Sequence, residues 1–113
     1  LGWHNVTRAM EGLVVKRSRQ IERRIRKIQQ TLAQLGDMRP GSLSRQSRSW
    51  GGQYYQLSYT HLGKGHTEYV APDRVQDVKR QIANYKKFKT LTQEWVTLAI
   101  ELCKLKKEPP DQK

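Results

Sequence analysis

The sequence has few of the features that tie a fold together covalently or anchor it in a membrane. Cys103 is its single cysteine, so neither an intramolecular disulfide nor a thiolate zinc site is expected, and a reducing cytoplasm is the default location. No stretch approaches the ~18 consecutive apolar residues that a membrane-spanning helix needs. The first residues, Leu1 to His4, show no charged segment followed by an apolar run, so no secretion signal is predicted.

Catalytic and cofactor-binding motifs are missing as well. His4, His61 and His66 have no cysteine or carboxylate at the spacing of a metal site. His66 and Glu68 share one face of an expected strand, but an exposed pair of this kind is more typical of structure than of general-base catalysis. The sequence has no phosphate loop, nucleophile elbow or HExxH motif. We therefore predict a protein that is not an enzyme and that binds no metal or cofactor.

Acidic residues are scarce. Twenty-two Lys and Arg residues stand against ten Asp and Glu residues, which gives a net charge of +12. An excess of this size in a short chain indicates a polyanionic partner, namely DNA, RNA or an anionic membrane surface. We expect nucleic acid, with DNA favoured over RNA, and no membrane association. A charged scaffold without such a partner is the other interpretation.

Apolar residues make up only 35% of the chain, which suits long helices that share a narrow seam better than a thick globular core. From about residue 7 to residue 35 they recur at near-heptad spacing. The positions are Val14, Ile21, Ile25, Ile28, Leu32 and Leu35. A second helix is expected from Pro72, because apolar residues continue at threes and fours from Val75 to Leu105.

The segment between the two helices has a different pattern. Residues 53–60 alternate and bring Tyr55, Leu57 and Tyr59 to one face, which we assign to the core. A glycine-bracketed turn at residues 63–65 leads to a second β-prone run at residues 66–70. The two runs predict a β-hairpin that is stable only if it packs on the helices.

The predicted fold is therefore mainly α. It consists of two long antiparallel helices, a coiled-coil-like hairpin, with a β-hairpin inserted between them. The expected divisions are an N-terminal helix over residues 1–36, a basic loop and β-hairpin over residues 37–71, a C-terminal helix over residues 72–108 and a disordered tail over residues 109–113. Because two helices share so narrow a seam, we also expect self-association.

The positive charge falls in two clusters, one in each expected helix. They comprise Lys16, Arg17, Arg19, Arg23, Arg24, Arg26 and Lys27, and then Lys79, Arg80, Lys86, Lys87 and Lys89. In an antiparallel hairpin, residues 16–27 would lie level with about residues 81–92, so the two clusters would overlap. Such like charges repel one another, and a bound polyanion would relieve that repulsion.

The loop before the predicted hairpin, residues 39–52, is expected to be flexible, basic and rich in hydroxyl groups. It can grip phosphates through Arg39, Arg45 and Arg48. Trp50 and Tyr54 can either stack on unpaired bases or pack on the loop. Lys64, in the glycine-bracketed turn, joins these residues as a candidate contact to nucleic acid.

The other ends of the two helices are apolar over more of their circumference than one helical partner can cover. The residues are Leu13, Val14, Val15, Trp95, Val96, Leu98, Ile100 and Leu102. A thicker two-helix core is one interpretation of this surface. We prefer the other, which is an interface for a homodimer or for a partner in a larger nucleoprotein complex.

A series of short motifs runs through residues 38–105. They are Gly41-Ser42-Leu43-Ser44-x-Gln46, Tyr54-Tyr55-x-Leu57-Ser58-Tyr59-Thr60, Gly63-Lys64, Thr67-x-Tyr69-Val70 and Asn84-Tyr85. In this series the chain resembles a family of short uncharacterised prokaryotic proteins often encoded beside transposase genes. Members commonly carry a cysteine cluster between the equivalents of Gln46 and Tyr54, and this chain has no cysteine there. The resemblance thus implies a mobile-element or genome-defence setting without a zinc site.

These observations together predict a cytoplasmic, non-enzymatic accessory protein that binds nucleic acid. No short recognition helix of a helix-turn-helix is apparent, so sequence-specific reading of the major groove is not expected. The alternative is a coiled-coil structural adaptor that docks on an acidic protein partner.

Overall fold

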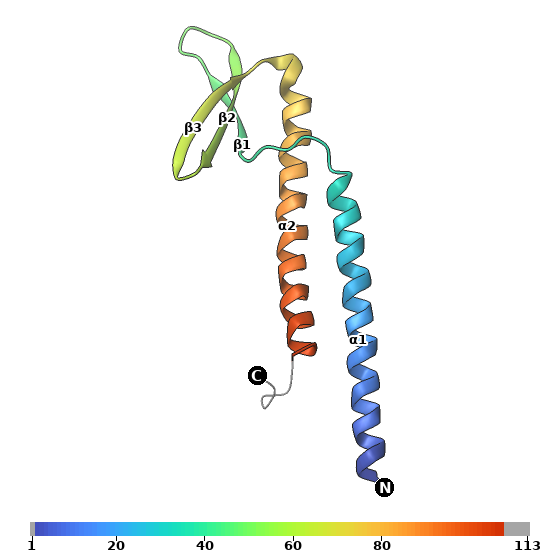
Figure 1. Cartoon of the computed structure of the whole chain (residues 1–113). Coiled ribbons are helices and arrows are strands. Elements are labelled where there is room, and N and C mark those ends of the chain that lie inside the picture. Colours follow the sequence, from blue (N-terminus) through green and yellow to red (C-terminus); the bar gives the residue numbers. More distant parts are fainter. Residues whose placement is uncertain (1, 108–113) are drawn as a thin grey trace. The chain divides into compact units, whose positions relative to one another are not determined.

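The computed structural model describes the backbone of residues 2–107 and the side chains of residues 8–107 (Figure 1). In chain order the elements are α1 (Gly2–Ala33), β1 (Ser42–Ser47), β2 (Gln53–His61), β3 (Lys64–Val70), the 3-10 turn η1 (Pro72–Arg74) and α2 (Val75–Leu105). Two compact units divide the chain, one formed by Leu1–Gln34 with Leu91–Lys113 and the other by Leu35–Thr90. Helix α2 therefore contributes to both units. The tail predicted at residues 109–113 lies outside the described residues.

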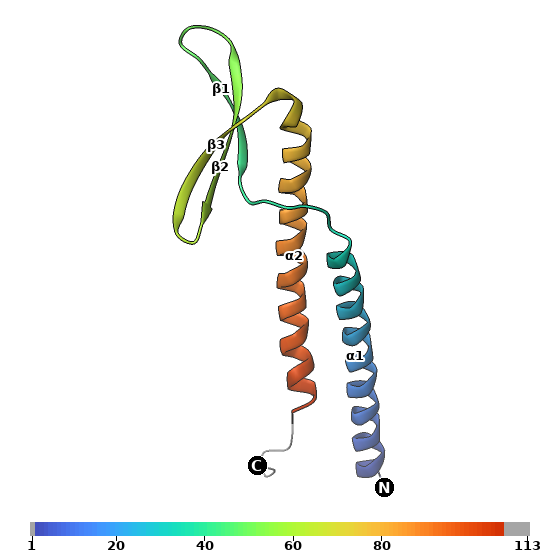
Figure 2. The ribbon, with the colours of Figure 1, turned by 45° about the horizontal axis from the view of Figure 1, so that its top comes forward.

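The unit of residues 35–90 is built on a three-stranded antiparallel sheet with the strand order β1-β2-β3. Leu43 of β1 lies opposite Leu57 of β2, and Tyr55 of β2 lies opposite Val70 of β3. The loop between β1 and β2 and the turn between β2 and β3 lie at opposite ends of the sheet (Figure 2). Alternation along each strand then sends one set of side chains to each face.

One face of this sheet packs on the first turns of α2. The buried cluster joins Leu57 and Val70 of the sheet to Val75, Val78 and Ile82 of the helix. The helical residues recur at threes and fours, so they form one stripe that faces the strands. Leu43, Tyr55 and Tyr59 pack around the cluster. The prediction that Tyr55, Leu57 and Tyr59 point to the core is confirmed.

Strand β1 was not predicted, because the loop expected over residues 39–52 includes it. Only Leu43 is apolar among the six residues of β1, and the serines around it favour turns. A single apolar residue cannot produce a detectable period of two. Pairing with residues 53–58 of β2 supplies the backbone hydrogen bonds that hold β1 in the sheet, although its own sequence does not predict a strand. Of the predicted loop, residues 39–41 and 48–52 therefore lie outside the strands.

An extended segment links α1 to β1 and lies along α2. The backbone N–H of Arg39 donates to the carbonyl of Gln81 at 3.2 Å, and the side-chain amide of Asn84 donates to the carbonyl of Asp37 at 2.8 Å. At Gly41 the backbone turns with φ +133, and an added Cβ would lie 2.8 Å from the carbonyl oxygen of Ser58. Only glycine fits both the conformation and the space.

The other unit pairs α1 with the last turns of α2. The two segments run antiparallel, because Arg17 bonds Glu101 while the later Arg24 bonds the earlier Glu94 (Figure 1). Of the predicted seam on α1, only Ile21 and Ile28 are buried. Val14 is exposed, and Ile25 and Leu32 are half-buried.

The prediction of a coiled-coil-like hairpin is consequently wrong in two respects. The buried stripe at the start of α2 is used by the sheet, so it is not available for continuous heptad packing against another helix. The insert between the helices is a three-stranded sheet and not a β-hairpin. What holds of the prediction is the order of the elements, with two long helices and β structure between them.

Gly41 provides a test of this arrangement. Gly41→Ala should lower the free energy of unfolding by about 1–3 kcal/mol, because its Cβ would meet the backbone of β2 in a conformation that strains any L side chain. The matched control is Gly12→Ala, where the added Cβ meets nothing within 4 Å in a helix. That change should raise the free energy by up to about 1 kcal/mol. Urea denaturation measures both, and equal stability of the two variants would contradict the account of Gly41.

Candidate nucleic-acid interface

Two arginines of the basic cluster on α1 are held by carboxylates of α2. Nε and Nη2 of Arg17 donate to the two carboxylate oxygens of Glu101 at 2.6 and 2.9 Å. Arg24 makes the same forked contact with Glu94 at 2.6 and 2.7 Å. Forked pairs fix the direction of the guanidinium plane as well as its position. Arg17 and Arg24 therefore have a structural role within this unit.

These pairs alter the acidity of the groups involved. The pKa of Glu94 and the pKa of Glu101 lie below the ordinary value, chiefly because each carboxylate accepts side-chain hydrogen bonds from its arginine. The pKa of Arg17 and the pKa of Arg24 are raised, for the same reason. All four side chains remain partly exposed to solvent, so screening by water limits what each pair adds to stability.

The remaining basic residues of the cluster form a separate stripe, which we call the α1 stripe. Its members are Lys16, Arg19, Arg23, Arg26 and Lys27, all exposed. None of them forms an ion pair with any side chain that the structure describes. At 100° per residue they cover the side of the helix that lies opposite Ile21 and Ile28. The first four border a shallow hollow of about 420 Å³.

The two basic clusters do not overlap as predicted. Arg17 and Arg24 lie beside Glu101 and Glu94, about ten residues further along α2 than an uninterrupted hairpin would bring them. Within the sheet unit, residues 37–39 themselves lie beside residues 81–84 of α2. The stripe and the lysines at residues 79–89 belong to different units.

Several predicted contacts of the sheet unit have partners within the chain. Arg39 pairs with Glu68 at 2.7 Å and lies over the ring of Tyr59. This contact and a hydrogen bond from Tyr59 lower the pKa of Glu68. Arg80 pairs with Asp77, three residues earlier on α2, at 2.6 Å. Arg39 and Arg80 are therefore less available to a partner than their charge suggests.

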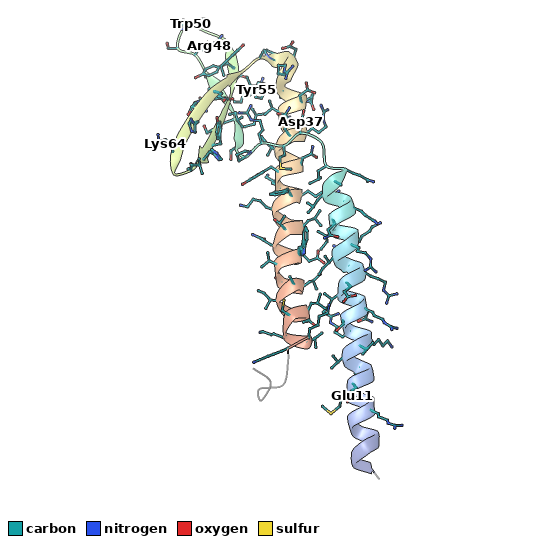
Figure 3. The ribbon with its side chains drawn as sticks, viewed as in Figure 1. Glu11, Asp37, Arg48, Trp50, Tyr55 and Lys64 are labelled. Carbon is teal, nitrogen blue, oxygen red and sulfur yellow. The ribbon has the colours of Figure 1, made fainter. Side chains whose placement is uncertain are left out.

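The other basic residues of this unit are spread over its surface. Lys79 and Lys86 line a hollow of about 470 Å³ beside Gly41, Ser42 and Leu43. The guanidinium carbon of Arg45 lies 6.0 Å from the ring centre of Tyr55. Nζ of Lys89 lies 5.8 Å from the ring centre of Tyr85. Lys87 is exposed, as is Lys64, which lies in Figure 3 at the end of the sheet opposite Trp50. The structure does not gather these residues into one patch.

Arg48 and Trp50 lie together at the loop between β1 and β2 (Figure 3). The guanidinium carbon of Arg48 lies 5.0 Å from the ring centre of Trp50 and 4.9 Å from that of Tyr54. The ring centre of Tyr54 lies 6.4 Å from that of Tyr69. Tyr69 was missed among the candidate contacts. The alternation of residues 66–70 was the signal for it, because Val70 is buried and Tyr69 must then face away from the core.

The residues of the predicted apolar interface differ in how far their side chains are exposed to solvent. Leu13, Val14, Val15, Val96 and Ile100 are exposed. Trp95, Leu98 and Leu102 are half-buried within the helical unit. The predicted homodimer or partner surface stays a prediction, now centred on the five exposed residues.

No helix among the described residues is long and apolar enough to cross a membrane. Within the same part of the chain, no three His, Cys, Asp or Glu side chains gather in a way that suits a metal ion.

Comparison with known proteins identifies one family. Residues 18–80 match the family described as a domain of unknown function, DUF6788. The match spans more than half of the chain and covers the second half of α1, the whole sheet and the first turns of α2. No curated protein and no solved structure matches the chain.

The lowered pKa values of Glu94 and Glu101 lead to a pH dependence. A carboxyl group with a lower pKa in the folded state stabilises the fold at pH values above its ordinary pKa of about 4.3, and this stabilisation is lost as the pH falls through the folded value. The double variant Glu94→Gln with Glu101→Gln should melt at a lower temperature than wild type near neutral pH. The difference should shrink as the pH falls below about 4. Melting curves followed by circular dichroism test this, and a difference that does not change with pH would exclude the role given to the two pairs.

Proposed function

We propose that this chain, which belongs to the DUF6788 family of unknown function, is a non-enzymatic accessory protein that binds the sugar–phosphate backbone of nucleic acid through the α1 stripe. The observation that carries the proposal is the division of the basic residues on α1. Arg17 and Arg24 are neutralised by Glu101 and Glu94, whereas the five members of the stripe have no acidic partner among the described residues.

The geometry of the stripe suits a chain of phosphates. From Lys16 to Arg26 the helix rises about 15 Å. One strand of a duplex presents about four phosphates over that length. Lys16, Arg19, Arg23 and Arg26 follow one another at intervals of three or four residues, so their successive Cβ atoms lie about 5–6 Å apart. Flexible Lys and Arg side chains can adjust to such a backbone without reading its sequence.

The unpaired stripe also has an energetic cost that binding would remove. Like charges three or four residues apart destabilise a helix by about 0.2–0.5 kcal/mol for each pair. Glu22 borders the same hollow as the stripe, but its carboxylate pairs with Lys106 at 3.0 Å and not with a member of the stripe. A polyanion lying along the stripe would turn the repulsion into attraction and release bound counterions. This favours a binding surface over a solvated face without a partner.

Self-association is a second element of the proposal. Met10, Glu11, Val14 and Val15 line one apolar hollow, and Val96, Ala99, Ile100 and Cys103 line another together with Lys104 and Lys107. The first hollow has an acid on its border and the second has two lysines. Two copies that exchanged these surfaces would bury the apolar residues and bring opposite charges together.

The cellular setting is also part of the proposal. The motif resemblance to proteins encoded beside transposase genes supports a mobile-element or defence nucleoprotein complex, with DNA as the natural target and the cytoplasm as the location. Because no element within residues 2–107 has the form of a helix-turn-helix recognition helix, backbone contacts are expected to dominate the affinity.

The division of the arginines gives a matched pair of variants. Arg19→Gln with Arg23→Gln should weaken nucleic-acid binding and reduce the slope of log K against log salt by about 1.8 on a duplex, which is about 0.9 for each lost contact. Arg17→Gln with Arg24→Gln removes the same charge from the same helix. It should leave the slope nearly unchanged and lower the melting temperature instead.

Fluorescence anisotropy with labelled oligonucleotides at several salt concentrations measures these slopes, and circular dichroism checks that the helices persist. An equal loss of slope in the two double variants would mean that binding follows net charge alone. Absence of binding by the wild-type protein at low salt would remove the proposed function.

The self-association surface has its own test. Ile100→Glu would put a carboxylate into the exposed apolar hollow beside Cys103. Sedimentation velocity should then report a smaller mass for this variant than for wild type, because burying the new charge costs more than the apolar contact gains. An unchanged mass, or a wild type that is already monomeric at high concentration, would count against this surface.

A further inference from the structure

The face of the sheet turned away from α2 has an unusual composition, and we call it the open face. The pairing register and the alternation of the strands assign it eleven residues. They are Ser42, Ser44, Gln46 and Arg48 from the first strand and its end, Tyr54, Gln56, Ser58 and Thr60 from the second, and Gly65, Thr67 and Tyr69 from the third. None of them is buried. The set contains no carboxylate and no aliphatic side chain.

Aromatic groups and one cation cluster at one end of this open face. Arg48 is held between the rings of Trp50 and Tyr54, and the ring of Tyr69 follows that of Tyr54 across the sheet. Trp50 is 79% exposed and Tyr69 is 60% exposed. Aromatic rings that serve only to stabilise a fold bury most of their surface, so burial explains neither Trp50 nor Tyr69.

Hydrogen-bonding groups occupy the other end. Ser42, Ser58, Thr60 and Thr67 line a hollow of about 510 Å³, together with Tyr59 and His66. The hydroxyl groups can donate to phosphate oxygens and can accept from base or sugar donors. The ring of His66 is stacked on that of Tyr59 at 4.9 Å between ring centres. Both rings belong to the face turned toward α2, so on the open face the hollow offers hydroxyl groups.

We propose that the open face is a platform on which unpaired bases stack, so that through this face the protein binds single-stranded nucleic acid. The inference rests on the proposed function and specifies its substrate. Trp50, Tyr54 and Tyr69 supply flat apolar surfaces, and Arg48 adds a planar cation that stacks in the same manner. Bases inside a duplex are already stacked on their neighbours, so only a single strand can offer its faces to this surface.

The absence of carboxylates on the open face favours the same partner. A solvated sheet face without a ligand commonly carries charges of both signs. On the open face the ionised side chain is Arg48, whose positive charge attracts phosphate. Serine, threonine and glutamine side chains can follow a backbone of variable conformation, and they impose no sequence. A platform of this kind is sequence-tolerant, because every base has a ring face that can stack.

Anisotropy with labelled dT20 and with a 20-base-pair duplex tests the platform. The triple variant Trp50→Ala, Tyr54→Ala and Tyr69→Ala should bind dT20 about 10–100-fold more weakly, which corresponds to the loss of one or two stacked bases. Its affinity for the duplex should stay within about twofold of wild type, and its salt slope should not change, because no phosphate contact is lost.

Three further variants guard against an effect on folding. Trp50→Ala alone changes an exposed loop residue, so it cannot unfold the core and should still weaken dT20 binding by about fivefold or more. Tyr54→Phe with Tyr69→Phe keeps both rings and should bind as wild type does. Leu62→Ala removes a side chain that is 87% exposed at the opposite end of the sheet, and it should change neither affinity.

Tryptophan emission provides an independent reading. Addition of unlabelled dT20 should quench the emission of the wild-type protein, and Trp50→Phe should abolish that quenching although Trp3 and Trp95 remain. Unchanged dT20 affinity in the triple variant, or an equal loss on dT20 and duplex, would overturn the platform. If Arg19→Gln with Arg23→Gln still weakens binding in that case, the proposed function stands without it. Failure of the wild type to bind either oligonucleotide would remove both.

Discussion

The scarcity of carboxylates is the constraint on which the rest of this structure depends. Ten acidic residues cannot neutralise twenty-two basic ones, so the position of each carboxylate decides which cations are left free. On α2, Glu94 and Glu101 are two helical turns apart, and they meet Arg17 and Arg24, which have the same spacing on α1. This match fixes the antiparallel alignment of the helical unit. It also leaves Lys16, Arg19, Arg23 and Arg26, on the outer side of α1, without an acidic partner among the side chains that the structure describes.

A second constraint is the way in which α2 is shared between the two units. Its first turns place Val75, Val78 and Ile82 against Leu57 of the sheet, and its last turns supply the carboxylates that hold α1. Because one helix covers only one face of a three-stranded sheet, the other face stays in contact with solvent. The protein thus has two surfaces with distinct chemistry, a cationic stripe and an aromatic, hydroxyl-rich face.

The sequence predicted much of this architecture where apolar periodicity was strong. The helices, the turn after β2 and the inward direction of Leu57, Tyr55 and Tyr59 follow from alternation and from spacings of three and four residues. Strand β1 was not predicted, because Leu43 is its single apolar residue. The coiled-coil-like pairing failed because the apolar stripe at the start of α2 can pack against a sheet as well as against a helix, and periodicity does not distinguish the two partners.

The candidate site was predicted as a cluster and not as a stripe. A run of basic residues does not reveal which of its members will be paired, since every lysine and arginine in it carries the same charge. The shared spacing of Arg17 with Arg24 and of Glu94 with Glu101 was the available signal. Its interpretation required the alignment of the two helices, and the predicted alignment differed from the observed one by about ten residues of α2.

Chemical footprinting of arginine side chains in the wild-type protein tests this central claim most directly. A guanidinium-specific reagent, read out by mass spectrometry, reports the reactivity of each arginine with and without saturating oligonucleotide. The account predicts that Arg19, Arg23 and Arg26 react readily in the free protein and become protected in the complex, whereas Arg17 and Arg24 react slowly in both states. Protection that is equal at all five positions, or that is confined to Arg17 and Arg24, would contradict it.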